Sequence, residues 1–181
     1  MANAALVVPS KNYVNIDCSV VSTPPSCILD GAGTNQILFL NTTANVSLSG
    51  LTLQNGYTAG HKIPTATGHN SINGGGGAVF VSPGATLTAN GDTFAHNTAT
   101  ALGGAIFEGG SATVHVEGAT FTGNSAPTTL SNSHGGTVSN GGAIFDYSGA
   151  TEGPVGTVLD DANAIFSGNF PNDVMNTPMF G

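Results

Sequence analysis

Two short words recur along this chain of 181 residues. The first is Gly-Gly-Ala followed by Ile or Val and then Phe, and the second is Phe-x-x-Asn. The first word occupies residues 76–80, 103–107 and 141–145, and the second occupies residues 94–97, 121–124 and 166–169. Both words recur after 27 residues between their first and second copies. A fixed period of this size indicates stacked structural repeats, each of which buries its apolar face only against its neighbours.

The segments between these words alternate apolar and polar residues, as in T-V-H-V at residues 113–116. Alternation with a period of two predicts β-strands. Helices are disfavoured because each glycine costs a helix about 1 kcal/mol and the chain has 27 glycines. We therefore expect an all-β fold, namely a right-handed single-stranded parallel β-helix (a β-solenoid) of about six to seven coils stacked about 4.8 Å apart.

Each repeated residue type suits one place in such a coil. The phenylalanines of the second word would stack as one inner column, and aliphatic residues would form another. The asparagines would lie at a corner where stacked amides bond one another and the turning backbone, and the paired glycines would allow a sharp corner. The residues are Phe94, Phe121 and Phe166; Val46, Leu87, Val114 and Val158; Asn97, Asn124 and Asn169; and Gly76, Gly77, Gly103, Gly104, Gly141 and Gly142.

The pairing of GGA(I/V) with F-x-x-N resembles the repeat of the polymorphic outer-membrane-protein family. The likeness covers residues 44–169, in which each word occurs three times. It implies a right-handed parallel β-helix of the pectate-lyase-like type at the cell surface, because members of that family are surface-exposed adhesins and autotransporter passengers. Their C-terminal membrane barrel has no counterpart in this sequence. Since similar repeats occur in secreted proteins of diverse function, the resemblance implies a location more than an activity.

We expect one domain, residues 1–181, around the repeat core 44–169. Insertions at 56–75 and 125–140 both follow the second word, so they should lie on one face of the solenoid. The apolar segment 170–181 is expected to cap the last coil, whereas the start shows no cap. Because an uncapped β-helix exposes its core and strand edges, we expect a fragment of a longer surface protein or a subunit docked end-on in an assembly. A distorted first coil with polar neighbours is the alternative.

The two insertions carry the candidate binding residues His61, Lys62, His69 and His134. Their common face suits contact with a protein partner or a neutral glycan. Convergent histidines could also bind a transition metal or act as general bases, but no H-x-H or H-E-x-x-H spacing occurs. We therefore expect polar loop residues that pack on each other or on a partner, and no metal site.

Two sets of carboxylates should stack on adjacent coils. Glu108 and Asp146 each follow the GGAIF word, and Glu117 aligns with Asp161, with Asp160 beside it. Stacked carboxylates repel unless they share a proton or a cation. We expect solvated side chains and no cofactor, with Ca²⁺ as the alternative; the Ca²⁺-binding nonapeptide of toxin-type β-rolls is absent.

The balance of charge excludes several classes of partner. The chain contains two lysines, no arginine and a formal net charge of −8. Nucleic-acid binders neutralise phosphates with clustered Lys and Arg, which this chain lacks. Anionic membrane surfaces and acidic polysaccharides are poor partners for the same reason, and no apolar run is long enough to span a membrane.

The missing arginine also bears on catalysis. Pectate-lyase-type enzymes rely on an arginine base, and galacturonase-type hydrolases combine aspartates with a G-H-G turn and a basic R-I-K element. Asp160-Asp161 and His134-Gly135 match fragments of the second pattern in the wrong chain order. Two carboxylates could still hydrolyse a neutral glycan. We expect a non-catalytic protein, with a carbohydrate-active hydrolase as the alternative and no catalytic residue assigned.

The cysteines bear on the compartment. Cys18 and Cys27 frame an eight-residue loop with a Pro-Pro turn, which predicts a disulfide; two small buried thiols are the alternative. Asn41 and Asn45 begin N-glycosylation sequons. We therefore expect an extracellular, cell-surface or other extracytoplasmic location.

An outward ladder of Thr86, Thr113 and Thr157 suggests an ice-binding protein as a further alternative, against the ordinary preference of threonine for strands. The expected function is nevertheless a non-catalytic β-helix module with a structural or adhesive role. It would display its loops to a protein or neutral glycan, or dock into a larger assembly.

Overall fold

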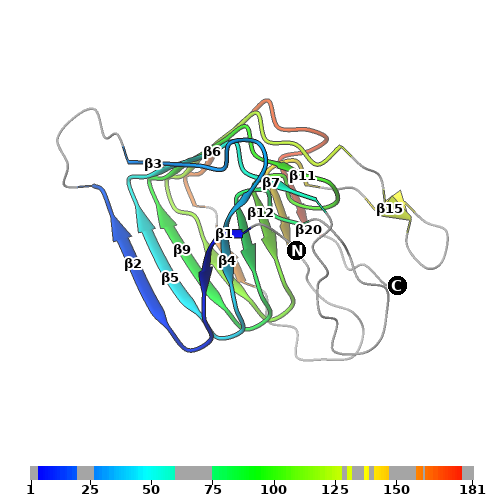
Figure 1. The fold of residues 1–181 in the computed structure, drawn as a ribbon. Coiled ribbons are helices and arrows are strands. Elements are labelled where there is room, and N and C mark those ends of the chain that lie inside the picture. Colours follow the sequence, from blue (N-terminus) through cyan, green and yellow to red (C-terminus); the bar gives the residue numbers. More distant parts are fainter. Residues whose placement is uncertain are drawn as a thin grey trace.

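The computed structural model describes residues 4–19, 27–59, 75–127, 130–131, 137–138, 141–146, 158–160 and 162–176. Every regular element in these residues is a β-strand, so the expected all-β class is confirmed (Figure 1). Since this part of the chain contains no helix, it also contains none that could cross a membrane.

Three parallel sheets build the stack (Figure 1). Sheet A contains, in order, β1 (Ala4–Val8), β4 (Gln36–Leu40), β8 (Val79–Val81), β12 (Ile106–Glu108), β17 (Ile144–Asp146) and β20 (Val174–Asn176). Sheet B contains β2 (Tyr13–Asp17), β5 (Asn45–Ser49), β9 (Thr86–Asn90), β13 (Thr113–His115) and β18 (Val158–Asp160). Sheet C contains β3 (Ile28–Asp30), β6 (Thr52–Gln54), β10 (Thr93–Ala95), β14 (Thr120–Thr122) and β19 (Ile165–Ser167).

Two smaller pairings complete the strands. A short parallel pair joins β7 (Tyr57–Thr58) to β11 (Thr98–Ala99), and an antiparallel pair joins β15 (Leu130–Ser131) to β16 (Thr137–Val138). The chain visits sheets A, B and C in turn, and each pass pairs in parallel with the next. This arrangement is that of a β-solenoid, as the repeat predicts.

The aromatic column of the second word is present in sheet C. Phe94 and Phe121 stack with ring centroids 4.7 Å apart, and Phe121 and Phe166 follow at 5.0 Å. The strand register pairs the same three residues. Equal spacing along the chain has therefore become vertical stacking, as expected.

A second aromatic column lies in sheet A and was not predicted. It contains Phe39, Phe80, Phe107 and Phe145, with ring centroids 5.0, 5.1 and 5.8 Å apart. The residues on either side of Phe80, Val79 and Val81, belong to the solenoid core. Because side chains alternate along a strand, this column faces away from that core, yet Phe80, Phe107 and Phe145 are fully buried.

The expected asparagine ladder closes one corner. The Asn97 amide donates to Asn124 Oδ1, and the Asn124 amide donates to Asn169 Oδ1, each at 3.0 Å. The three amides also donate to the carbonyls of Leu53, Phe94 and Phe121, one coil earlier. Each side chain thus bonds both its neighbour and the backbone, and Asn97 and Asn124 are completely buried.

The two glycines of the first word serve different purposes. Gly103 has a φ of +62°, in the left-handed region that glycine adopts without strain. Gly104 lies so close to the next coil that a Cβ there would overlap the Gly142 carbonyl and the Ser125 backbone. The first glycine therefore makes the turn, and the second lets adjacent coils approach.

The structure corrects the predicted register of one strand. Val114 pairs with Leu159, and Thr113 pairs with Val158, so Val158 does not continue the column of Val46, Leu87 and Val114. The physical reason is that Thr113 and Val158 lie at the same distance before their phenylalanines, Phe121 and Phe166. The extra residue of this coil therefore precedes β18 and does not follow it.

The segment expected to cap the last coil contributes a strand. β20 pairs with β17 in parallel, so this part of the segment extends sheet A. Phe170, which was expected to fold over the coil, is exposed. Residues 177–181 lie outside the described part of the chain.

Candidate functional site

The strands of the first coil form an open end of the stack. Among the described strands, β1, β2 and β3 each pair on one side only. In Figure 1 these blue strands stand at one end of their sheets. A strand at a sheet edge offers unpaired N–H and C=O groups to another strand. The first coil is therefore a surface on which a further strand can add.

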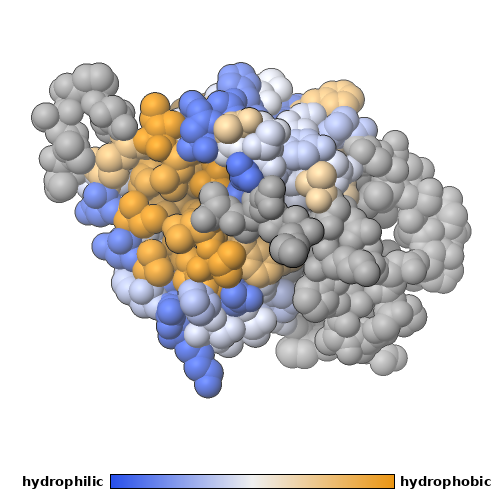
Figure 2. Space-filling model, in the orientation of Figure 1, coloured by the Kyte–Doolittle hydropathy of each residue, from blue (hydrophilic) through white to orange (hydrophobic). Residues whose placement is uncertain are grey.

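Apolar side chains gather at this end. The inward-facing Val14, Ile16 and Leu29 pack on the core but are only half-buried. Ile28, Tyr13 and Leu6 are 53%, 66% and 43% exposed. Figure 2 shows a contiguous hydrophobic patch on the face of the molecule where the first-coil strands lie. Contiguous exposed apolar surface marks interaction sites in folded proteins.

The other end of the stack is open as well: β18, β19 and β20 are at the edges of their sheets, with β20 one coil beyond the other two. Phe166 is half-buried, although Phe121 in the same column is completely buried. Val174 is likewise half-buried, whereas Ile144, its partner in β17, is completely buried. Ile165 at the rim is 61% exposed. Both ends of the described stack thus leave part of the core uncovered.

The outward columns of sheets B and C share a pattern. In both columns the inner coils carry polar residues and the first coil carries an apolar or aromatic residue, and in sheet C the last coil carries an apolar residue as well. The sheet C column is Ile28, Thr52, Thr93, Thr120 and Ile165. The sheet B column is Tyr13, Asn45, Thr86, Thr113 and Val158. Apolar residues at outward positions occur in these two columns where a coil has no further neighbour.

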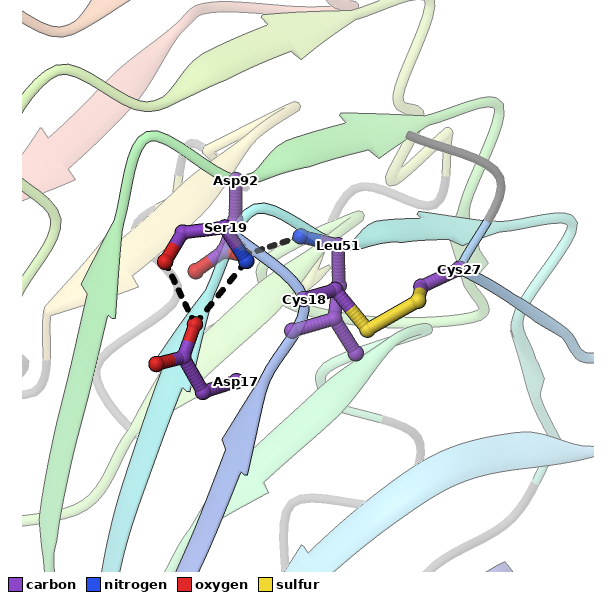
Figure 3. Close-up of a disulfide and its surroundings, with 6 residues drawn as sticks. All are labelled: Asp17, Cys18, Ser19, Cys27, Leu51 and Asp92. Carbon is purple, nitrogen blue, oxygen red and sulfur yellow. Dashed lines mark hydrogen bonds between the residues drawn. A yellow bond between two sulfur atoms is a disulfide. The ribbon is translucent and has the colours of Figure 1, made fainter. Parts of the chain in front are cut away.

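The expected disulfide is present and fastens the first coil (Figure 3). Cys18 follows β2 and Cys27 precedes β3, with their Cα atoms 6.2 Å apart. Beside it, the backbone N–H and the hydroxyl of Ser19 donate to the Asp17 carboxylate at 2.9 and 2.6 Å. These bonds lower the pKa of Asp17. The disulfide fits an oxidising environment.

A buried carboxylate lies at the same corner and was missed from the sequence (Figure 3). Asp92 is 1% exposed, and its Oδ1 accepts the Leu51 N–H at 2.7 Å. Its Oδ2 has no hydrogen-bond partner. Burial raises the pKa of Asp92 to about 6, although hydrogen bonds from the Leu51 and Asn90 backbone oppose the shift. A signal was available, since Leu51 and Asp92 both stand between a glycine and a strand threonine.

The stacked pair Glu108 and Asp146 is confirmed in register but not in environment. The two residues are directly opposite each other in β12 and β17. Both are buried, so the expectation of solvated side chains is wrong. The reason is that they follow Ile106 and Ile144 by two residues, and the period of two turns all four side chains to the core face. Among the described residues, no group of three or more His, Cys, Asp or Glu could hold a metal ion.

The residues predicted to bind a partner cannot be placed. His61, Lys62, His69 and His134 lie outside the described residues, as do Gly135, Asp161 and Thr157. Asp160 is opposite His115 in register. The expected alignment of Glu117 with Asp161 involves a residue outside the described ones and stays a prediction. The hydrolase alternative therefore stays a prediction.

The two sequon asparagines differ in exposure. Asn45 is exposed on β5, and Asn41, in the preceding turn, is half-buried. Glycosylation at either residue remains a prediction.

The expected threonine ladder in sheet B is interrupted, and sheet C contains a threonine ladder that was not predicted. Thr86 pairs with Thr113, but the next residue in that column is Val158. In sheet C, Thr52, Thr93 and Thr120 form an uninterrupted outward column. Each of these threonines directly precedes a core residue of the strand, which is the signal that would have identified the column.

Comparisons with protein families, curated proteins and solved structures find no match to this chain.

Proposed function

We propose that this protein is a non-catalytic, extracytoplasmic β-helix module with a structural or adhesive role, which joins a larger assembly through the open end of its stack. The proposal takes the coil as right-handed, with about six to seven turns. The insertions 56–75 and 125–140 would be displayed on one face of this rod, toward a partner protein or a neutral glycan.

The observation that carries the proposal is the first coil, which combines exposed apolar side chains with unpaired strand edges. Long, apolar, exposed edges are a liability that proteins ordinarily blunt with charge, proline or a covering segment. Here Ile28 and Tyr13 stand where the following coil has Thr52 and Asn45. Such a surface is suited to burial against another coil.

Location and composition support the same proposal. The Cys18–Cys27 disulfide suits an extracytoplasmic compartment. The two-word repeat resembles that of surface-exposed passengers and adhesins. A rod with two lysines and no arginine lacks the cations that the familiar β-helix lyases and galacturonases use, which favours a non-catalytic role.

Cysteine labelling tests end-on docking. Tyr13→Cys places a thiol at the open end, and Asn90→Cys places one on the same sheet two coils away. Both native side chains are exposed. In the isolated chain, a membrane-impermeant maleimide should label both variants at similar rates. In the native surface assembly, labelling of Tyr13→Cys should fall at least about tenfold while Asn90→Cys stays reactive. Equal labelling of both in the assembly would contradict the proposal.

Ice binding is a second candidate function, which the sheet C column Thr52, Thr93 and Thr120 favours. A regular outward row of threonines on a parallel sheet offers hydroxyls and methyls at the strand spacing of about 4.8 Å. Thr93→Lys should abolish thermal hysteresis, whereas Ser10→Lys, an equal charge change in the exposed turn after β1, should preserve it. A native chain without thermal hysteresis would exclude this function.

A further inference from the structure

We propose that Gln36 is a positioning residue for the first displayed insertion, residues 56–75, because its buried side chain holds the two ends of that insertion together. This inference rests on the proposed display of the insertions and names the residue that fixes one of them. The contacts that support it lie inside the stack, between β4, β7 and the residues that precede β8.

The two ends of the insertion meet at one corner of the stack. Thr58 in β7 pairs with Ala99, and Gly75 forms a bridge with Leu102. The two paired positions are three residues apart in that next coil, whereas residues 59–74 lie between them here. The next coil therefore holds both ends of the insertion on one side through backbone pairing.

Gln36 holds the same two ends on the other side. Its Nε2 donates to Thr58 Oγ1 at 3.2 Å and to the carbonyls of Gly75 and Gly76 at 3.1 and 2.5 Å. An amide has two N–H groups, so one of them is shared between two of these acceptors. The Thr58 hydroxyl also donates to the Gly76 carbonyl at 2.8 Å. Because all four residues are buried, the network closes the stem of the insertion away from water.

The Gln36 side chain replaces a backbone bond that other coils make. Gln36 occupies in β4 the place that the second glycine of the first word holds before β8, β12 and β17. Between the next two coils, the Gly76 N–H donates to the Gly103 carbonyl at 3.0 Å. The equivalent N–H one coil earlier belongs to Asn35, and it donates to the Gly31 carbonyl instead. The Gly76 carbonyl is therefore bonded by the Gln36 amide.

A glutamine is a costly choice for this place. Gln36 is 2% exposed, and its Oε1 has no hydrogen-bond partner among the described residues. A buried acceptor without a partner costs free energy. An apolar residue would avoid that cost but could not bond the two ends of the insertion. The position therefore favours the amide donors over packing alone.

A closed stem suits the proposed display of the insertion. A loop whose ends are held together has fewer conformations to lose when a partner binds, so a fixed stem increases affinity without adding a contact. At the second insertion, residues 125–140, the place of Gln36 is held by Gly104, whose backbone N–H donates to the Gly141 carbonyl at 3.1 Å. The side-chain bond is therefore particular to the first insertion.

Gln36→Met tests the inference, because methionine has nearly the same length and no N–H donor. Hydrogen exchange of the isolated chain should accelerate at least about tenfold at Tyr57 and Gly76 and stay unchanged in β13 and β14. Gln54→Met is the matched control, because Gln54 donates to Asp30 on the exposed side of β6, and it should change neither rate. Unchanged exchange at both stem residues would overturn the inference. Faster exchange throughout the stack would do the same, because it would indicate a loss of general packing.

Trypsin gives a second readout, because the chain has no arginine and only two lysines, Lys11 and Lys62. Lys62 belongs to the insertion in the sequence, and Lys11 is exposed in the turn between β1 and β2. In Gln36→Met, cleavage after Lys62 should accelerate at least about tenfold relative to cleavage after Lys11, because opening the stem releases the chain on either side of Lys62. The same ratio in the native chain and the variant would overturn the inference.

A pair of substitutions at Thr58 tests the same network if Gln36→Met does not fold. Thr58→Val removes the hydroxyl and Thr58→Ser keeps it, so only Thr58→Val should accelerate exchange at Gly76. Equal rates in these two variants would contradict the network. The open end of the stack takes no part in it, so labelling of Tyr13→Cys is an independent result. Protection of Tyr13→Cys together with an unaltered stem would overturn this inference and leave the proposed assembly standing.

Discussion

Ile28 and Ile165 occupy the same outward column of sheet C at opposite ends of the described stack. They are 53% and 61% exposed, and the three residues between them are threonines. Outward positions of a solvated sheet are usually polar, as the inner coils show. The isoleucines are therefore the two apolar ends of an otherwise polar column, a relationship that only the strand register reveals.

Asp92 should make stability depend on pH. Its pKa is about 6 in the folded protein and near 3.8 in the unfolded chain. The unfolded state therefore loses its proton first, and the contribution of Asp92 to stability is greatest below pH 4 and falls as pH rises through 6. Asp92→Asn removes this pH-dependent contribution to the free energy of unfolding, because an amide does not titrate. Chemical denaturation should show that the variant gains on the order of 2 kcal/mol relative to the native chain between pH 4 and pH 7.

The comparison across pH is the control for Asp92, because any fixed cost of the new amide is the same at both values. Asp17→Asn, at an exposed carboxylate beside the same corner, should not reproduce the gain. A constant difference between Asp92→Asn and the native chain across this range would show that Asp92 is not the titrating group.

The disulfide should stabilise the first coil. Cys18 and Cys27 are separated by 9 residues, and closing a loop of this size is worth about 2–3 kcal/mol in the unfolded-state entropy model. The double variant Cys18→Ser, Cys27→Ser should lower the free energy of unfolding by that amount in urea. Adding a reductant should destabilise the native chain similarly and leave the double variant unchanged. A reductant effect on the variant would point to a cause other than this bond.

The centre of the asparagine ladder should be more important than its end. Asn124 bonds to Asn97, to Asn169 and to the Phe94 carbonyl, and its removal leaves buried groups without partners. Asn124→Ala should cost about 3 kcal/mol of unfolding free energy. Asn169→Ala, at a half-buried residue, should cost less, and Asn90→Ala, at an exposed residue, should stay within about 0.5 kcal/mol. Equal effects at Asn124 and Asn90 would contradict a structural role for the ladder.

Close coil packing should make Gly104 intolerant of a side chain. A Cβ at Gly104 would overlap backbone atoms of Gly142 and Ser125, which cannot move independently of their coils. Gly91 provides the matched control, because it has a left-handed φ of +64° and no atom within 4 Å of its hypothetical Cβ. Thermal unfolding should show a loss of about 1 kcal/mol for Gly91→Ala and at least about 3 kcal/mol for Gly104→Ala. Similar losses would mean that the close approach is unimportant.

Much of the fold was predictable because a solenoid turns equal spacing in sequence into stacking in space. The 27-residue separation of Phe94 and Phe121 predicted their contact, and the same argument placed Asn97 on Asn124. Where spacing was unequal, prediction failed. Val158 was predicted to occupy the core position that Leu159 holds, because the sequence does not show whether the extra residue of this coil lies before or after β18.

The candidate site was less predictable, because the exposure of a side chain depends on the coils that are packed around it. Asp92 aligns in the sequence with the buried Leu51, but its raised pKa was not predictable, because it results from enclosure by the adjacent coils. Glu108 and Asp146 follow the same word in the sequence. They are buried because the alternation of side chains along β12 and β17 turns them toward the core, although both are acidic.

The sequence by itself determined the architecture of this protein: a repeat with alternating strands and a pair of cysteines whose spacing predicts a disulfide at the first coil. The tertiary structure decided which surfaces are available. Ile28 and Ile165 are ordinary strand residues in the sequence, and the fold leaves them exposed because each belongs to a strand that pairs on one side only. A side chain in a solenoid is covered by the coils above and below it, and only the assembled stack shows where that cover ends.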